Sequence, residues 1–146
     1  MSEFRSLSAS VLASPQITAG DIAEARDLGV TLVVNNRPEG EAADQVSGDQ
    51  IAEAARTAGL DYRAIPIDHS GFSMAQVEAM VDALESAQGK VLAYCRSGTR
   101  STLLWALAAA SKGADPEAIA QAAAAAGYDV SPVRGAMQEL AARTAG

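Results

Sequence analysis

Short apolar runs alternate with segments of helical periodicity from residue 18 onward. The runs at residues 30–34, 62–67 and 91–94 predict buried strands, because each is short and rich in aliphatic or aromatic residues. The segments between them predict helices that open on a capping pair and stop at glycine. The pairs are Thr18 with Asp21, Ser47 with Gln50 and Ser73 with Gln76, and the stops are Gly29, Gly59 and Gly89. This alternation predicts an α/β fold with three layers, α/β/α, around a central, mostly parallel sheet.

The chain beyond the strand at residues 91–94 predicts three more helices, over residues 101–112, 116–126 and 132–142. The alanine-rich second helix is expected to pack closely on its neighbours. Two further features predict core positions. They are Trp105 and the stripe of apolar residues spaced three or four apart that comprises Met74, Val77, Val81 and Leu84.

Length and composition indicate a soluble protein with one domain, residues 1–146. The net charge of −7 argues against nucleic acid or an anionic membrane as partner. One Cys and one His cannot form a zinc cluster, so no metal or cofactor is expected. A lone Cys cannot form an internal disulfide, which predicts a reducing compartment. The first 14 residues do not resemble a secretion signal, and the longest apolar stretch, residues 103–110, is too short to span a bilayer. A cytoplasmic location is expected.

The loop at residues 95–101 carries the candidate chemistry. A free thiol is mostly protonated at neutral pH, so a catalytic cysteine needs cationic neighbours and oriented amides. The small residues Ser97, Gly98 and Thr99 would let successive N–H groups turn inward toward Cys95, and the following helix adds the positive end of its dipole. The planar fork of Arg100 suits two oxygens of a bound oxyanion.

Two other residues of the loop have less central predicted roles. Arg96 is expected to face outward and to steer anions toward the site, and Ser101 to cap the helix or to hydrogen-bond the thiolate. The alternative is a buried structural cysteine that happens to precede a turn. The order of strand, Cys, small residues, Arg and helix favours a nucleophile at Cys95.

The spacing of Cys95, Arg100 and Ser101 resembles the active loop of single-domain rhodaneses, which are thiosulfate or persulfide sulfurtransferases. Four residues separate Cys95 from Arg100, whereas cysteine-dependent phosphatases place five there. The resemblance implies a small cradle, suited to a sulfane sulfur on Cys95 rather than to a whole phosphoryl group.

Residues 14–17, 35–41, 65–67 and 95–107 together resemble a bacterial family, the beta-lactamase-hydrolase-like, phosphatase-like domain. This resemblance implies the fold of dual-specificity phosphatases. Members of the family are described both as phosphatases and as sulfur transferases. In some proteins the domain is fused to a metallo-β-lactamase-type persulfide dioxygenase, which implies such an enzyme as a functional partner.

Four residues outside the loop are candidates for an accessory role at the site: Asp68, His69, Arg37 and Glu41. Asp68 follows the strand that ends at residue 67, so it should lie at the same sheet edge as Cys95 and could serve as general acid, or simply form a turn. His69 is an alternative acid or hydrogen-bond donor. Arg37 and Glu41 match the family motif, and a bracing ion pair is favoured over substrate contact for both.

Three functions follow from these residues. The first is sulfur transfer, in which Cys95 takes a sulfane sulfur from thiosulfate or a persulfide and passes it to a thiol acceptor. The alternative is hydrolysis of a phosphomonoester through a cysteinyl-phosphate, with Arg100 on the phosphoryl oxygens and Asp68 as acid. The third is a non-catalytic module that binds an anion or a persulfide.

Overall fold

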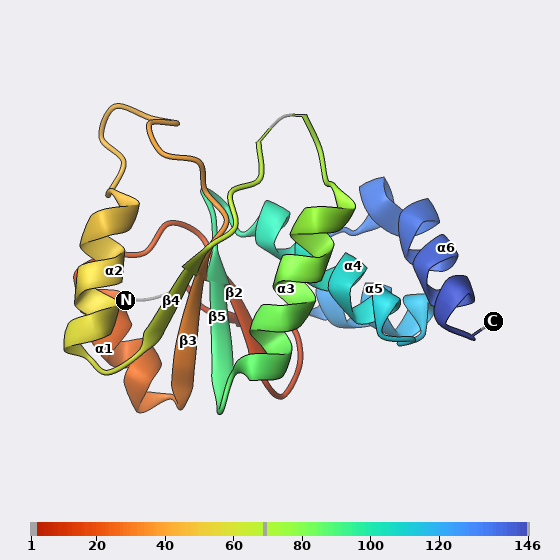
Figure 1. Ribbon diagram of the computed structural model, residues 1–146, viewed down its shortest axis with the longest axis horizontal. Helices are drawn as coiled ribbons and strands as arrows, with labels where there is room; N and C mark the ends of the chain where they lie inside the picture. Colours follow the sequence, from red (N-terminus) through yellow and green to blue (C-terminus); the bar gives the residue numbers. More distant parts are fainter. Residues whose placement is uncertain (1–2, 69, 146) are drawn as a thin grey trace.

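The computed structural model describes residues 3–68 and 70–145, and these build a five-stranded sheet in the order β1-β2-β5-β3-β4 (Figure 1). The strands are β1 (Arg5–Ser6), β2 (Val11–Ser14), β3 (Val30–Asn35), β4 (Asp61–Ala64) and β5 (Lys90–Tyr94). Every neighbouring pair is parallel except β1 with β2. The mostly parallel α/β sheet is as predicted, with β5 at its centre.

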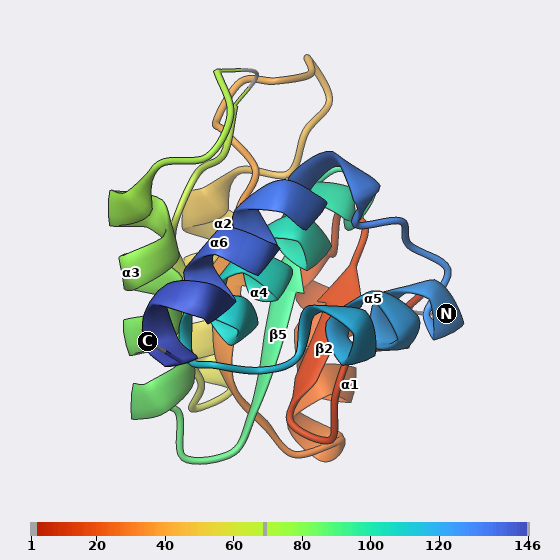
Figure 2. The ribbon, with the colours of Figure 1, turned by 90° about the vertical axis from the view of Figure 1, so that its right-hand side faces the viewer.

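Helices cover both faces of the sheet (Figures 1 and 2). On one face lie α1 (Ala19–Asp27) and α2 (Gly48–Thr57), and on the other α3 (Met74–Ser86), α4 (Thr99–Ser111), α5 (Pro116–Ala125) and α6 (Arg134–Ala145), with the 3₁₀ turn η1 (Ser131–Val133) before α6. Alternate residues of each central strand therefore enter different cores. In β5, Val91 and Ala93 face the α4 side, and Leu92 and Tyr94 face the α1 side.

The predicted capping pairs fix the helix starts. The side chains of Ser47 and Ser73 accept the backbone N–H of Gln50 and Gln76, which confirms two capping boxes. The carboxylate of Asp21 accepts the N–H of Thr18 at the start of α1 (2.9 Å). These local contacts determine the residues at which α1, α2 and α3 begin.

The structure differs from the sequence-based expectation at several places, among them the helix expected over residues 132–142, which is the turn η1 followed by α6. Strands β1 and β2 were not predicted. The third predicted strand, residues 62–67, is β4 only as far as Ala64, because Pro66 has no N–H to give to the ladder, although Ile65 and Ile67 still donate to Asn35 and Asn36 (both 2.9 Å). The helix expected from residue 101 begins two residues earlier, at Thr99.

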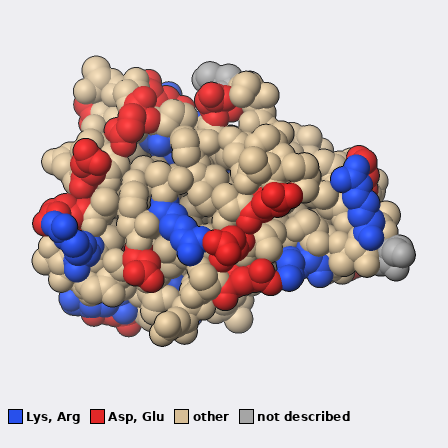
Figure 3. Space-filling model, viewed as in Figure 1, with Lys and Arg blue, Asp and Glu red and all other residues tan. Residues whose placement is uncertain are grey.

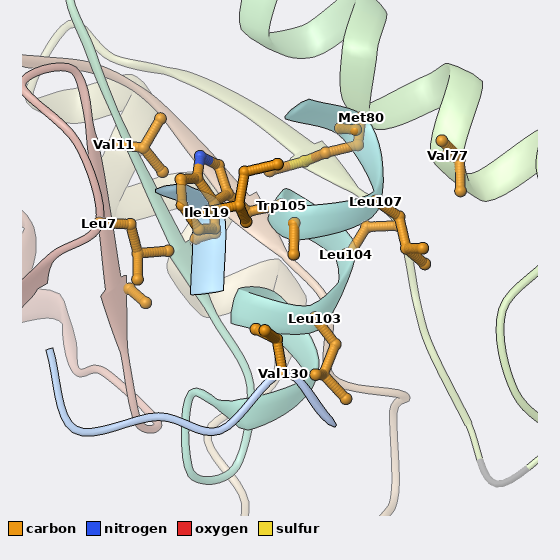
Figure 4. Packing of buried hydrophobic residues seen from close by; sticks show 14 of the residues in the cluster. Leu7, Val11, Val77, Met80, Leu103, Leu104, Trp105, Leu107, Ile119 and Val130 are labelled. Carbon is orange, nitrogen blue, oxygen red and sulfur yellow. The ribbon is translucent and has the colours of Figure 1, made fainter. Parts of the chain in front are cut away.

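Helix α4 is the centre of the larger core, as Figure 4 shows for Trp105 and Leu104. Trp105 is buried, as predicted. The predicted stripe on α3 is wrong at Met74, which is 46% exposed, and the buried face of α3 is formed by Val77, Met80 and Ala83. Within the described residues, no helix has the length and apolar character needed to cross a membrane.

Candidate active site

The carboxyl ends of the parallel strands bring the candidate residues to one edge of the sheet, the upper edge in Figure 1. Cys95 directly follows β5, and its N–H donates to the carbonyl of Ser14 at the end of β2 (3.3 Å). The carbonyl of Arg96 accepts the N–H of Gln16 (3.3 Å). The active loop, residues 95–100, is thus fastened to the segment that follows β2.

The Cys95 thiol lies at the bottom of the loop, with no exposed surface. The N–H of Gly98 donates to Cys95 Sγ (3.1 Å), so at least one of the predicted inward amides is in place. Gly98 is also the residue before α4 and adopts a left-handed conformation with φ 94°. The first turn of α4 therefore presents its positive end to the same loop.

Arg100 is held on two sides by hydrogen bonds. Its Nη1 and Nη2 donate to the two carboxylate oxygens of Glu41 (both 2.8 Å), and Nη1 also donates to the carbonyl of Ile67 (2.8 Å). The Glu41 hydrogen bond is the main cause of a raised pKa of Arg100, opposed by burial, and the neighbouring Cys95 acts in the same direction as Glu41. The guanidinium thus lies against Glu41, near the thiol, and stays charged.

Glu41 joins two arginines. Besides Arg100 it binds Arg37, whose Nε donates to Oε1 (2.9 Å), and Arg37 reaches on to Gln16 Oε1 (2.9 Å). The pKa of Glu41 falls from 4.5 to about 2, first through the Arg100 hydrogen bond, opposed by burial, and then through Arg37. The ion pair predicted for Arg37 and Glu41 is present. Glu41 interacts more strongly with Arg100 of the active loop.

Removal of the Glu41 charge is expected to destabilise the protein mainly above pH 4.5. Glu41→Gln leaves two arginines without their shared carboxylate, which should lower the free energy of unfolding at pH 7 by roughly 2–4 kcal/mol. A carboxylate whose pKa is lowered by folding adds its full contribution to the free energy of unfolding above its pKa in the unfolded chain. That contribution is lost as the pH falls from 4.5 toward about 2. Urea unfolding at pH 7 and pH 3 measures both effects.

The matched control is Glu117→Gln, since Glu117 pairs with Arg134 at the surface (2.6 Å). It should change the unfolding midpoint little at either pH. An equal loss in both variants, or a Glu41→Gln loss as large at pH 3 as at pH 7, would contradict a special role for the Glu41 carboxylate.

Asn36 is a supporting residue that the sequence did not single out. Its N–H donates to the carbonyl of Tyr94 (2.8 Å), its Nδ2 donates to the carbonyl of Ile65 (2.9 Å) and its Oδ1 accepts the Ser101 hydroxyl (2.7 Å). It thereby ties the ends of two strands to α4. The available signal was a polar pair, Asn35 and Asn36, directly after a buried strand.

The remaining loop residues divide into buried and exposed. Ser101 is fully buried against Asn36, and the residue before α4 is Gly98, so the expected helix-capping role of Ser101 is wrong. Arg96 is exposed, as expected for a steering charge. Ser97 Oγ donates to Thr99 Oγ1 (3.1 Å) and accepts the Thr99 N–H (3.3 Å), which stiffens the turn.

Asp68 lies in an exposed segment at the same edge. Its Oδ1 accepts the N–H of Ser70 (2.8 Å) and the Ser70 hydroxyl (2.6 Å), the pattern of an Asx turn. The turn predicted as the alternative is therefore present. His69 lies outside the described residues.

Acidic and basic side chains are interspersed on the face shown in Figure 3, without a broad field of one sign. With a net charge of −7, the molecule does not attract anions as a whole. Attraction of an anion to the site must therefore be local, from Arg100, Arg96 and the amides at the start of α4.

The cysteine follows the central strand and the arginine lies in the first turn of the next helix, in a fold that similar proteins assign to a phosphatase-like class of α/β protein. A crystal structure of a candidate phosphatase from Neisseria meningitidis Z2491 superposes with a TM-score of 0.83 at 29% identity, over 96% of this chain and 99% of that one. A candidate phosphatase of Shewanella putrefaciens CN-32 has a TM-score of 0.76 at 23% identity, over 99% and 94%.

The chain belongs to the beta-lactamase hydrolase-like protein, phosphatase-like domain family, whose model matches residues 3–113. The beta-lactamase hydrolase-like protein of Xylella fastidiosa strain Temecula1 is 38% identical over 79 residues, 54% of this chain. That stretch is only 18% of the length of the Xylella protein. The dual-specificity phosphatase fold expected from the sequence is confirmed.

Proposed function

We propose that the protein hydrolyses phosphomonoesters, with Cys95 as the nucleophile. The observation that carries this proposal is the convergence of the Gly98 N–H and the Arg100 guanidinium on the Cys95 thiol at the start of α4. One amide and one fixed cation beside a sulfur favour the thiolate and leave further donors for an oxyanion.

In the first step the Cys95 thiolate attacks phosphorus. The Sγ–P bond forms as the bond between phosphorus and the leaving oxygen breaks, and Arg100 with the loop amides binds the non-bridging oxygens. Asp68 gives its proton to the leaving oxygen. In the second step water attacks phosphorus, the S–P bond breaks, and Asp68 takes the proton of the water.

Two related folds support a phosphate substrate. Structures of Pseudomonas aeruginosa TpbA in complex with pTyr and of PTPMT1 in complex with PI(5)P have TM-scores of 0.67 and 0.72, each at 18% identity. Both ligands are phosphomonoesters, although their organic parts differ greatly. The phosphoryl group is therefore the part of the substrate that we assign here, and the alcohol is left open.

Sulfur transfer is the second candidate, favoured by one observation. Only four residues separate Cys95 from Arg100, so the loop offers fewer amides than a phosphatase loop of five. In this reaction Cys95 attacks the outer sulfur of thiosulfate, an S–S bond forms and sulfite leaves with its electron pair. A thiolate acceptor then attacks the outer sulfur, forming the acceptor persulfide and restoring the Cys95 thiolate.

A parallel assay distinguishes the two reactions. The purified protein is given p-nitrophenyl phosphate, thiosulfate with a thiol acceptor, or glutathione persulfide, with Cys95→Ser as the blank. Mass spectrometry of acid-quenched protein then identifies the adduct on its only cysteine. Phosphate release with a cysteinyl-phosphate supports the proposal. A persulfide without phosphate release overturns it in favour of sulfur transfer, and no turnover of any substrate indicates a binding module.

A further inference from the structure

The segment between α5 and η1 contacts the active loop through Tyr128. Tyr128 lies there, outside residues 3–113 that define the family match, and its hydroxyl donates to the carbonyl of Ser97 (3.2 Å). Its ring packs so close to the loop that a Cβ on Gly98 would collide with the phenol oxygen. Figure 2 shows this connection passing beside the first turn of α4.

The carbonyl that Tyr128 binds and the amide that Cys95 uses belong to one peptide group. In a trans peptide the Ser97 carbonyl and the Gly98 N–H point in opposite directions. Outward fixation of the carbonyl therefore turns the N–H inward, onto Cys95 Sγ (3.1 Å). Glycine tolerates either orientation of the peptide that precedes it, so the loop sequence alone does not choose between them.

Tyr128 is itself held in place from two sides. Its N–H donates to the carbonyl of Ala123 at the end of α5 (2.9 Å). Arg5 lies over the ring, with its guanidinium carbon 5.9 Å from the ring centre, and donates to the carbonyl of Ala126 (2.9 Å). The pKa of Tyr128 is raised, mainly by burial, and the nearby Cys95 adds to this, so the phenol keeps its proton as a donor.

We propose that Tyr128 is a positioning residue: its hydroxyl fixes the Ser97–Gly98 peptide so that the Gly98 N–H stabilises the Cys95 thiolate. This inference rests on Cys95 being the nucleophile of the proposed function. It does not depend on which substrate the thiolate attacks.

Tyr128→Phe tests this role, because it removes the hydroxyl and keeps the ring that packs on Gly98. The rate of Cys95 alkylation by iodoacetamide is measured against pH, which reports on the only thiol in the chain without any turnover. The midpoint of that profile should move upward by about half to one pH unit, the effect of weakening one hydrogen bond to an anion. The Gly98 amide proton resonance should also respond less to thiolate formation.

The matched control is Tyr62→Phe, which removes a phenol hydroxyl bonded to Asn35 on the α2 side (2.9 Å). Its profile should coincide with that of the parent. An unchanged profile in Tyr128→Phe, or equal shifts in both variants, overturns the inference. A missing phosphatase activity with the predicted alkylation shift would overturn the proposed function alone.

Discussion

Arg100→Lys should lower kcat/KM for a phosphate ester by roughly 10²- to 10³-fold, because one ammonium cannot replace the guanidinium fork. Arg100 donates to both oxygens of Glu41 and to the carbonyl of Ile67 while it faces Cys95. A lysine could keep one of these contacts at a time, so its charge would no longer be fixed beside the sulfur. Steady-state kinetics with p-nitrophenyl phosphate measures the loss.

Arg96→Lys provides the matched control in the same loop. Arg96 is exposed, so a lysine there keeps the long-range attraction of an anion, and kcat/KM should stay within about threefold of the parent. Urea unfolding of both variants shows whether either has lost its fold. Equal activity losses in two folded variants would show that Arg100 has no special role.

Asp68→Asn is expected to lower kcat/KM for phenyl phosphate by roughly 10²- to 10⁴-fold, the usual contribution of a general acid, because kcat/KM reports the first step, in which the leaving oxygen takes the proton. The effect should be much smaller for p-nitrophenyl phosphate, because nitrophenolate leaves readily without a proton. A comparison of the two esters therefore tests the chemical role of Asp68 and not only its place in the Ser70 turn.

The control for this prediction is Asp82→Asn, which changes an exposed carboxylate of α3 that pairs with Arg63 of β4 (2.8 Å). It should leave the rates with both esters unchanged. If Asp68→Asn reduces kcat/KM for phenyl phosphate and for p-nitrophenyl phosphate by the same factor, the loss reflects the loop conformation and Asp68 is not the proton donor. Unchanged thiosulfate turnover in Asp68→Asn would fit either outcome, since sulfite leaves without a proton.

Local signals explain which parts of the fold were predictable. The capping pairs at Ser47 and Ser73 determine helix starts through contacts three residues apart, and both are confirmed. Strand β2 has only four residues, its local partner β1 has two, and its parallel partner β5 lies about eighty residues later, so the nearby sequence marks it only weakly as a strand. Its place in the sheet depends on a non-local pairing that the apolar pattern alone does not encode.

The candidate site shows the same division. Cys95 and Arg100 were predicted because they share one short loop, and the Arg37–Glu41 pair because both residues lie in the stretch 35–41 that resembles the family. The contact of Arg100 with Glu41 spans 59 residues, and the support from Tyr128 reaches the loop across 31. Asn36 and Tyr128 carry no chemical motif of their own, so only the folded chain reveals what they hold.

The central position of β5 has a consequence for how the chain is made. Both β2 and β3 pair with β5, which is the last strand to be synthesised. During synthesis on the ribosome, the edges of β2 and β3 that pair with β5 therefore stay unpaired until residue 94 has left the exit tunnel. Aggregation during synthesis should thus be most sensitive to changes that delay the emergence of β5, and least sensitive to changes in the helices that follow it.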